Sequence, residues 1–491
     1  MASVALIGFM GAGKSRAAAA LAAARGAQAL DSDALLEDSM GHSIAREFEA
    51  HGEDAFRAKE EELVCALLAE AEVSGSGSAI ALGGGSVLSE RVRQALKPHL
   101  TVLVDVDPQT AWERAGGAER PLARDRESFF ALYEERRALY EELADATLLW
   151  ANAASGEYPV FVGSGLLEGA GWSDAVWPLD RSTSRAFCIA DETVAALHAP
   201  PPGAVHGGAI AIPPGEQSKT LATAEGVWQA LVERGATRAD HLVALGGGVV
   251  GDLAGFCAAT YQRGVPVVQV PTTLVAQVDS AYGGKTGVDL PQAKNYIGAY
   301  HQPAGVVVDP DVLSTLPKAE FEAGWVEVLK TALIAGGGLW DRVAADEPVD
   351  ERTILACART KLAVVAEDER DGGRRQALNL GHTVGHAIET ATGYSRYRHG
   401  EAVGLGLLAA LRLSGRPELR EQARELLVAH GLPTQLEGAD PERVVKLTAR
   451  DKKRLGTEAS VPFVLVDAPG EVRIGAHVGH DELRAAVAEL A

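Results

Sequence analysis

The sequence predicts an α/β protein of two successive units: a parallel sheet flanked by helices, then a larger unit with an α/β half and an all-helical half. Short apolar runs alternate with alanine- and glutamate-rich helical patterns, which is typical of βαβ units. Two separate glycine-rich turns, GFMGAGKS and ALGGGVVGDLAGF, each follow an apolar run. The chain of 491 residues also exceeds what one hydrophobic core usually supports.

The first unit contains three apolar runs that are each followed by a helical pattern. VALIGF precedes KSRAAAALAAA, SAIAL precedes SERVRQALK, and TVLVDV precedes PQTAWERA. A period of two that switches to a helical period predicts a strand followed by a helix. The first unit is therefore expected to be a parallel sheet.

The second unit begins with a further series of strand patterns. This series starts at YPVFVG (158–163) and continues through RAFCIAD, HLVALGGG and VPVVQVPTT. From about residue 318 the strand patterns fade, and helical patterns such as EFEAGWVEVLKTALI and GEAVGLGLLAALRL follow. The small, polar stretch WANAASGE (150–157) is interpreted as the junction. The predicted domains are residues 1–152, 157–318 and 319–491.

Composition and charge exclude several classes of partner. The chain has 67 acidic and 46 basic side chains and a formal net charge of −21, which argues against a nucleic acid or an anionic membrane as partner. No apolar run approaches the roughly 20 residues of a membrane span, and no targeting segment is evident. The four cysteines are far apart and form no CxxC pair, so a reducing, cytoplasmic location is expected.

The first glycine turn completes the motif GxxxxGK[ST] with Gly8, Gly13, Lys14 and Ser15. It follows a predicted strand and opens a predicted helix, which is the context that this phosphate-binding motif requires. Backbone N–H groups would surround the phosphates of ATP, Lys14 would compensate their charge, and Ser15 would bind magnesium. The predicted ATP-binding residues are Gly11, Ala12, Gly13, Lys14, Ser15 and Arg16.

Further polar residues indicate what this unit phosphorylates. Asp31-Ser32-Asp33 follows a short apolar run, where a carboxylate could act on a substrate hydroxyl. Then come FRAKEEELV with Arg57, ALGGGSV with Gly84, ERPLAR with Arg120 and EERRALYEELAD with Arg136. This order of motifs resembles shikimate kinase over residues 1 to about 150. The resemblance implies that Asp33 is catalytic, that Asp33, Arg57, Gly84 and Arg136 bind shikimate, and that Arg120 is a catalytic lid arginine closing on ATP.

This unit departs from the pattern of such kinases at its end. After LYEELADATLLW those kinases continue into an adenine-contacting loop and a last helix, whereas this chain passes almost directly into the next unit. The second unit is therefore a candidate source of the missing wall of the adenine site. An alternative hypothesis is that the first unit binds ATP without turnover.

The second glycine turn predicts a second anion site. ALGGGVVGDLAGF follows the apolar run HLVAL and opens a helix, so its backbone can approach a pyrophosphate without a Cβ in the way. AYGGKTGVDLPQAKN then places Lys285, Lys294 and Asn295 within eleven positions, interleaved with glycines. Lysines in this setting are expected to neutralise an anionic ligand.

A cluster of histidines further along predicts a metal site. LNLGHTVGHAIE places His382 and His386 four residues apart on one helical face, RHGEAVG adds His399, and WVEVLKTAL adds Glu327. Imidazole nitrogens and a carboxylate suit zinc. Spacing leaves open which three of these four residues bind the metal.

The order GGGVVGDLAGF, QRGV, PTTLVAQVDSAYGGKTGV, KN, EVLK, DERDGGRRQALNLGH, HGEAV and DKKR resembles 3-dehydroquinate synthase from about residue 158 to the end. The resemblance implies zinc, or cobalt, on Glu327, His382 and His399, and His386 as a base or proton relay. It implies that NAD is bound by Glu216, Lys219, Gly248, Val249, Val250, Gly251, Asp252, Thr272, Thr273, Lys285 and Lys294. Substrate would be held by Arg263, Asp279, Lys285, Asn295, Lys330, Lys361, Arg375, Asn379 and Lys453, with Lys285 and Lys330 also catalytic and Arg263 reaching across a homodimer.

The two resemblances imply a bifunctional enzyme of aromatic amino-acid (chorismate) biosynthesis. The first unit would phosphorylate shikimate at its 3-hydroxyl with ATP and magnesium. The second would convert 3-deoxy-D-arabino-heptulosonate 7-phosphate to 3-dehydroquinate and phosphate, with NAD oxidising a ring hydroxyl and later returning the hydride, so no net redox occurs. The open alternatives for the second unit are another sugar-phosphate cyclase or a polyol dehydrogenase.

Overall fold

The computed structural model describes residues 3–115, 125–167, 172–180, 182–200, 207–291, 293–448 and 462–491. The predicted strands and helices quoted above are confirmed, and further strands lie between them. The first unit contains β1 (Val4–Ile7), α1 (Lys14–Arg25), β2 (Ala29–Asp31), α2 (Ser32–Met40), α3 (Ile44–Ser74), β3 (Ala79–Ala81), α4 (Glu90–Leu96), β4 (Leu100–Val104), α5 (Pro108–Ala115), α6 (Arg126–Leu143) and β5 (Ala146–Ala153). All five strands are parallel, in the order β2-β3-β1-β4-β5.

A second set of parallel strands continues the same sheet. It consists of β6 (Gly156–Val162), β7 (Ala186–Asp191), β8 (Gly208–Ile212), β9 (His241–Gly246), β10 (Val267–Pro271) and β13 (Gly305–Val308), in the order β6-β13-β10-β9-β7-β8. The helices of this half are α7 (Trp172–Ala175), α8 (Glu192–Leu197), α9 (Leu221–Glu233) and α10 (Gly248–Thr260). The hairpin β11 (Lys285–Leu290) and β12 (Ala293–Tyr300) forms a separate two-stranded sheet.

The stretch interpreted as the junction lies in a tight hairpin within the sheet. β5 and β6 pair antiparallel, from Thr147 opposite Val162 to Ala153 opposite Gly156. Eleven of the described strands, five from the first unit and six from the second, therefore form one continuous sheet. The small, polar composition of residues 150–157 reflects a hairpin turn and the exposed strand ends beside it, because such residues suit turns as well as linkers.

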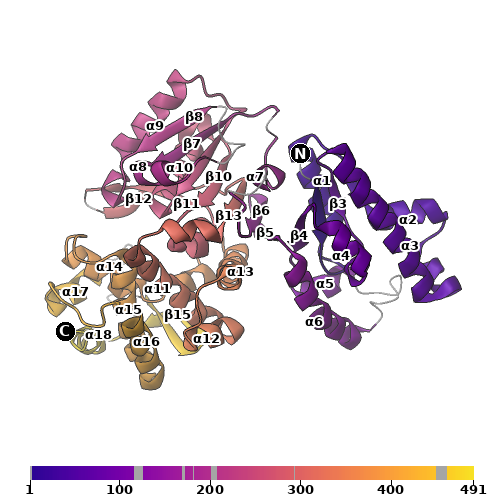
Figure 1. Cartoon of the computed structure of the whole chain (residues 1–491). Helices are drawn as coiled ribbons and strands as arrows, with labels where there is room; N and C mark the ends of the chain where they lie inside the picture. The colour runs from indigo at the N-terminus through magenta and orange to yellow at the C-terminus, as the bar shows by residue number, and fades with distance from the viewer. Residues whose placement is uncertain are drawn as a thin grey trace.

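This hairpin places the two glycine turns at opposite edges of the sheet. Strands β1 and β9 belong to the two parallel sets, and the antiparallel β5–β6 pair reverses the direction of one set relative to the other. Each glycine turn follows the carboxyl end of its strand, β1 or β9. Figure 1 shows the first unit beside the α/β half of the second unit, with the helical half below that half.

The C-terminal half is mostly helical but not entirely so. It contains α11 (Lys318–Ala335), α12 (Gly337–Ala344), α13 (Glu351–Glu367), α14 (His382–Ala391), α15 (His399–Leu413), α16 (Pro417–Ala429), α17 (Pro441–Thr448) and α18 (His480–Ala488). The prediction of an all-helical half needs one correction, because β14 (Pro462–Ala468) and β15 (Glu471–His477) form an antiparallel hairpin. The inner strand PFVLVDA buries four consecutive residues against the helices, which favours a strand over an amphipathic helix.

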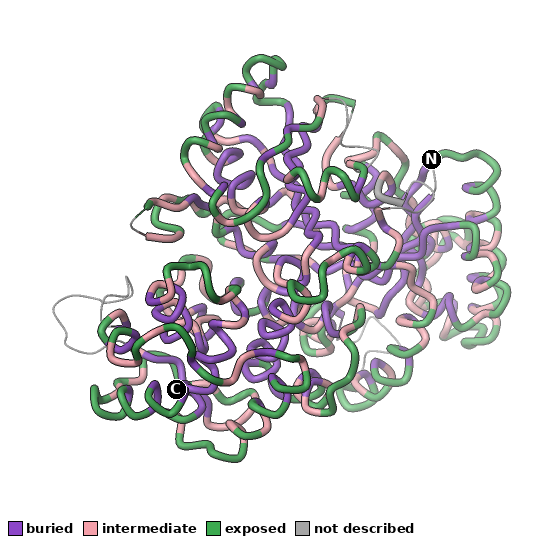
Figure 2. Tube along the Cα trace, turned by 60° about the vertical axis from the view of Figure 1, so that its left-hand side comes forward, coloured by how far each residue is buried: buried purple, intermediate pink, exposed green. Residues whose placement is uncertain are grey.

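Apolar side chains of the two units pack together in shared hydrophobic cores. One core combines the first unit with sheet residues of the second, such as Val243, Val268 and Val307. Another joins Leu149 and Tyr158 of the central hairpin to the helical half. Figure 2 shows the buried segments running through the middle of the molecule and the exposed residues on the outer turns of the helices. Among the described residues, no helix is both long enough and apolar enough to cross a membrane.

Candidate active sites

The phosphate loop of the first unit has the backbone that the motif requires. Gly13 caps the N-terminus of α1 with φ 90°, a left-handed conformation that favours glycine. At Gly11 a Cβ would lie 2.6 Å from the carbonyl oxygen of Ala111, so a side chain is excluded there. The ammonium of Lys14 donates to the carbonyl oxygens of Gly8 and Phe9 at 2.9 and 3.1 Å, which places its charge inside the loop.

The residues expected to bind shikimate gather around Gly83–Gly85, the three glycines that follow strand β3. A Cβ on Gly83 would lie 2.6 Å from Oδ1 of Asp33, and a Cβ on Gly85 would lie 2.0 Å from Nη1 of Arg57. The hydroxyl of Tyr140 donates to the carbonyl oxygen of Gly84 at 2.5 Å. Burial raises the pKa of Tyr140 to about 12, with the Arg136 guanidinium acting in the opposite direction. Asp33, Arg57, Gly84 and Arg136 are therefore neighbours, although they come from four separate segments.

The two carboxylates of Asp31-Ser32-Asp33 have different roles. Asp31 caps helix α2, because its Oδ1 accepts from the backbone N–H groups of Asp33 and Ala34 at 3.0 and 3.3 Å. The Asp33 carboxylate points toward Gly83 instead. Asp33 is therefore the carboxylate of this pair that lies beside the glycines at 83–85.

Sequence reasoning missed Glu60, which holds Arg57 in place. The Glu60 side chain is only 4% exposed, and its Oε2 accepts from Nη1 of Arg57 at 2.6 Å. Its Oε1 accepts from the hydroxyl of Ser86, which follows the glycines. The i,i+3 spacing of Arg57 and Glu60 on one helix was the available signal.

Arg16 connects the phosphate loop to the second unit. It follows Ser15 in the first turn of α1, and its guanidinium lies 4.5 Å above the ring of Trp150 and forms an ion pair with Glu157. Trp150 and Glu157 lie on β5 and β6, the two strands of the central hairpin. The hairpin therefore borders the nucleotide end of the phosphate loop.

In the second unit, the glycine turn leaves room for a ligand at the N-terminus of α10. Gly247 is the N-cap of α10 and has no side chain to satisfy the first N–H groups. A Cβ on Gly247 would lie 2.8 Å from Cγ2 of Thr273, and one on Gly248 would lie 3.1 Å from Oγ of Ser280. Among the described residues, the buried hydroxyl of Thr272 has no hydrogen-bond partner. This cradle of backbone donors fits a dinucleotide pyrophosphate.

The other residues expected around the nucleotide form a chain of ion pairs. Lys219 pairs with Asp252 at 2.5 Å, and Lys294 lies 3.7 Å from Glu216. Burial lowers the pKa of Lys219, but the carboxylates of Asp252 and Glu216 more than offset this effect and raise it. Val249 and Val250 lie in the first turn of α10, and Gly251 packs against Gln269. These residues surround the glycine turn.

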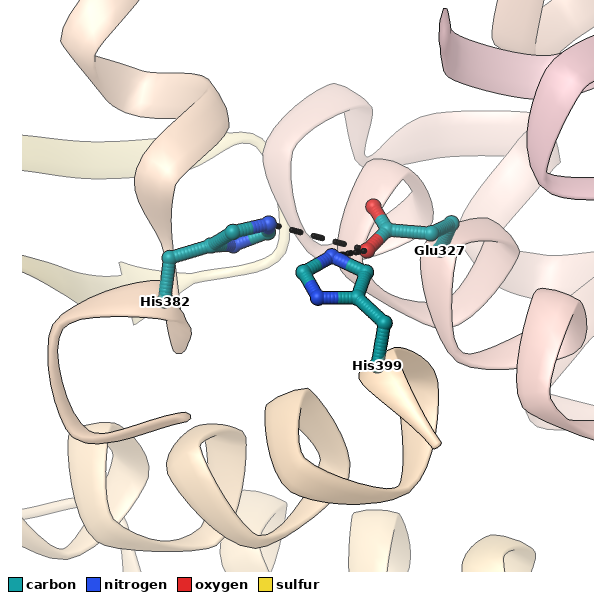
Figure 3. Close-up of side chains that lie close together, drawn as sticks. All are labelled: Glu327, His382 and His399. Carbon is teal, nitrogen blue, oxygen red and sulfur yellow. Dashed lines mark ion pairs between the residues drawn. The ribbon is translucent and has the colours of Figure 1, made fainter. Parts of the chain in front are cut away.

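Three helices bring together Glu327, His382 and His399, the three residues implied as metal ligands (Figure 3). Nε2 of His382 lies 3.7 Å from Oε1 of Glu327, and Nε2 of His399 lies 3.6 Å from the same oxygen. Zinc bonds of about 2.0–2.2 Å in a tetrahedron separate neighbouring ligand atoms by roughly 3.3–3.6 Å. The observed spacing of the three donors therefore fits a zinc ion.

The carboxylate of Glu327 adds a second argument for a cation. Glu327 is 1% exposed, and among the described residues its Oε1 has no hydrogen-bond donor. A buried carboxylate oxygen without a donor is costly, and a metal ion would satisfy it. Its other oxygen lies 2.5 Å from Nζ of Lys330. His386 lies beside this group, with its ring centroid 5.3 Å from that of His382.

A half-buried aspartate with two buried lysines lies next to the metal cluster. Asp279, in the short helix η6 (Ala276–Ser280), accepts from Lys330 at 2.8 Å and from Lys361. Burial raises the pKa of Asp279, but the two ammonium groups hold it well below its usual range. Burial lowers the pKa of Lys361, and Asp279 only partly offsets this effect. The site thus holds two lysines that could meet an anionic substrate.

Lys285, the first residue of β11, and Arg375, in the short helix η8 (Arg374–Asn379), lie beside this cluster. Lys285 pairs with Asp371 at 2.6 Å, and Arg375, which is 1% exposed, donates to the carbonyl oxygen of Gly283 at 2.9 Å. Asn379 ends η8, directly before the helix that carries His382. Asn295 adjoins Lys294 with φ 54° and an exposed side chain. Asp371, which sequence reasoning missed, lies in the DERDGG motif.

The structure does not bring Arg263 to this site. Arg263 is exposed and follows the C-terminal end of α10, whereas the glycine turn lies at the N-terminal end. Thirteen helical residues separate the two ends by roughly 20 Å. Arg120 and Lys453 lie outside the described residues.

The fold and the two sites define a two-site enzyme, in which a phosphate-loop kinase unit is joined to an α/β unit with a nucleotide turn beside a candidate metal centre. The family model of shikimate kinase matches residues 10–157. The models of the N-terminal and C-terminal parts of 3-dehydroquinate synthase match residues 209–323 and 324–454. The chain belongs to the 3-dehydroquinate synthase family and carries a shikimate kinase unit in front of it, so it combines two enzymes of the shikimate pathway.

Relatives of the second unit are similar over nearly their whole length. The chain is 44% identical over 338 residues to 3-dehydroquinate synthase from Halorhodospira halophila, which covers 66% of this chain and 93% of that protein. It is 42% identical over 348 residues to 3-dehydroquinate synthase from Symbiobacterium thermophilum, covering 67% and 96%. Among solved structures, 2-epi-5-epi-valiolone synthase from Streptomyces hygroscopicus, with NAD+ and Zn2+ bound, superposes with a TM-score of 0.61 at 24% identity, covering 68% of this chain and 96% of that one. At that identity the likeness shows the fold alone.

Proposed function

We propose that the first unit transfers the γ-phosphoryl group of ATP, with magnesium, to the 3-hydroxyl of shikimate. We propose that the second unit converts 3-deoxy-D-arabino-heptulosonate 7-phosphate to 3-dehydroquinate and phosphate, with NAD and zinc or cobalt. The observation that carries this proposal is the cluster of Glu327, His382 and His399 beside two buried lysines on Asp279. A polyol dehydrogenase has no phosphate to expel and no need of these lysines.

In the first unit, the proposed roles follow from charge and position. The guanidinium groups of Arg57 and Arg136 suit the carboxylate of shikimate, because guanidinium pairs with a carboxylate in a bidentate manner. Asp33 would accept the proton of the attacking hydroxyl, and Lys14 would neutralise the phosphates. Ser15 would offer its hydroxyl to magnesium. Glu60 keeps Arg57 oriented while the substrate is absent.

In the second unit, NAD when bound would supply reversible oxidation of a ring hydroxyl, and the metal on Glu327, His382 and His399 would polarise the oxygen. The side chains of this unit would bind the substrate and transfer protons during that reaction. Lys330, Lys361 and Arg375 would neutralise the substrate's anionic groups, and Lys285 would meet the departing phosphate. His386 lies next to the metal cluster without belonging to its three ligands, so it is placed to accept or return a proton.

Two parallel assays on the purified chain test the proposal. One measures inorganic phosphate released from 3-deoxy-D-arabino-heptulosonate 7-phosphate with NAD, together with absorbance of NADH. The other measures ADP released from ATP with shikimate. We expect phosphate without net NADH, and ADP that depends on shikimate. Accumulating NADH would contradict the cyclase chemistry, another carbocyclic product would point to a sister cyclase, and bound ATP without ADP release would contradict the kinase.

We also propose that the second unit acts as a homodimer in which Arg263 completes the neighbouring site. The support is that Arg263 is exposed and remote from the glycine turn of its own chain. The test is to mix two inactive variants, Arg263→Ala and His382→Ala, under conditions of subunit exchange. If Arg263 acts on the neighbouring site, mixed dimers contain one intact site and activity returns. No recovery, with subunit exchange verified by tagged chains, would refute the role in trans.

A further inference from the structure

His399 lies between two buried carboxylates, one on each side of its ring. Its Nε2 lies 3.6 Å from Oε1 of Glu327, and its Nδ1 lies 3.5 Å from Oε1 of Glu389. Glu389 is on α14, one turn after His386, and its side chain is 3% exposed. His386, Glu389 and His399 form a second group with the spacing of metal ligands, which shares His399 with the first group. One nitrogen of the His399 ring therefore cannot bind a metal ion in both groups at once.

The two carboxylate oxygens nearest His399 differ in their other partners. Glu389 has an ammonium partner, because Nζ of Lys294 lies 3.3 Å from its Oε1. Glu327 also has an ammonium partner, because Nζ of Lys330 lies 2.5 Å from its Oε2, but its Oε1, the oxygen near His399, has no hydrogen-bond donor among the described residues. The oxygen without a donor is thus on the Glu327 side of His399, and the oxygen beside an ammonium group is on the Glu389 side.

We propose that Glu389 is a positioning residue that accepts a hydrogen bond from Nδ1–H of His399 and thereby holds the lone pair of Nε2 toward Glu327 and the metal. This inference rests on the proposed metal site and goes beyond its three ligands. A carboxylate on the second nitrogen of a ligating histidine fixes the tautomer and raises the basicity of the metal-binding nitrogen. Glu389 itself does not bind the metal.

The contact also connects the metal site to the nucleotide half. Lys294 is on β12, in the hairpin that follows the nucleotide strands, and it lies 3.7 Å from Glu216 as well as close to Glu389. Its ammonium lies 4.6 Å from the ring centroid of Tyr394, just beyond α14. The orientation of His399 therefore depends on a lysine from the other half of the unit.

The test measures metal affinity and ligand geometry in the whole chain. Co2+ is titrated into metal-free protein against a chelator, and the visible d–d spectrum of the loaded protein is recorded. We expect Glu389→Ala to weaken Co2+ binding by roughly 10- to 100-fold, and Glu389→Gln, which keeps an acceptor oxygen, to weaken it less. The spectrum of each saturated variant should match that of the wild type.

A matched control is Glu320→Gln, which removes a carboxylate that pairs with Arg398, the residue before His399. This variant should bind Co2+ like the wild type.

A changed d–d spectrum in saturated Glu389→Gln would overturn the proposal by making Glu389 a ligand, and unchanged affinity in both Glu389 variants would overturn the positioning role. If the wild-type chain binds no stoichiometric Co2+ or Zn2+, the proposed metal site fails together with this inference. If the wild type binds the metal and shows synthase turnover, and both Glu389 variants bind Co2+ with unchanged affinity, then only this inference is refuted and the proposed function stands.

Discussion

Arg359 on helix α13 of the synthase forms a two-pronged ion pair with Asp105 at the end of strand β4 of the kinase, with Nε 2.8 Å from Oδ2 and Nη2 3.0 Å from Oδ1. Both side chains are partly buried, 33% and 18% exposed. Two residues further along the same helix, Lys361 contacts Asp279 in the synthase site. Helix α13 is therefore attached to the kinase at one point and supplies a substrate-site lysine at another.

We predict that Arg359→Met lowers the free energy of unfolding by about 1–2 kcal/mol, because it leaves the partly buried Asp105 without its bidentate partner. Thermal and urea unfolding check this prediction. Arg374→Met is the control, since Arg374 pairs with Glu367 at the surface with both side chains about 60% exposed and should change stability by under roughly 0.5 kcal/mol. Equal losses in both variants would contradict a special role for the Arg359 contact.

The opposite placement of the two glycine turns predicts independent activities. Lys14→Ala should reduce shikimate-dependent ADP release by at least about 100-fold, because the phosphates lose their charge partner, and should leave phosphate release unchanged. His382→Ala should do the reverse. Both assays are run on each variant, together with its melting temperature. Loss of both activities in a variant that melts like the wild type would show that the sites are coupled.

The position of Arg16 predicts a role in ATP affinity. Arg16→Ala should raise the KM for ATP about 10-fold with a smaller change in kcat, because a charge-assisted contact to the phosphates is worth roughly 1.5–3 kcal/mol. The KM for shikimate should stay constant. Arg91→Ala, at an exposed pair with Glu61, serves as the control. An unchanged KM for ATP would exclude Arg16 from the nucleotide site and leave it as a contact to Trp150 and Glu157 alone.

The raised pKa of Glu351 predicts that the stability of the folded chain depends on pH. Glu351 begins helix α13, and burial raises its pKa from 4.5 to about 7, with Asp350, Asp311 and Asp309 nearby acting in the same direction. Its raised folded-state pKa means that the folded chain binds more protons than the unfolded chain between these values. The stability that this group contributes is therefore complete below about pH 4.5 and is lost as the pH rises through 7.

Glu351→Gln should remove this part of the pH dependence. Relative to the wild type, the variant should be equally stable near pH 4.5 and more stable above pH 7, by at most about 3 kcal/mol and by less where solvent screens the charge. Urea unfolding at several pH values measures the difference. A difference between the two proteins that does not change from pH 5 to pH 8 would contradict the prediction.

The sequence by itself determined the elements and most of the site residues. Glycine motifs between an apolar run and a helical pattern predicted both nucleotide turns, because only a strand followed by a helix makes such a turn useful. The spacing of His382 and His386 predicted a shared helical face, although spacing left open which residues bind the metal. Glu389, Asp371 and Glu60 escaped detection, since single carboxylates in helical patterns are common at surfaces.

Only the tertiary structure decided how the parts lie relative to one another. The stretch interpreted as the junction lies in the β5–β6 hairpin, whose antiparallel pairing merges two sheets into one and places the two glycine turns at opposite edges. The turn itself is local, and small, polar residues suit a turn as well as an open connection, whereas the parallel pairing of β6 with β13, far along the chain, is not encoded in local composition. Likewise, Glu327 and His399 meet only because helices α11, α14 and α15 pack around a common core. Local patterns determined which residues are present at the sites, and long-range packing determined which of them touch.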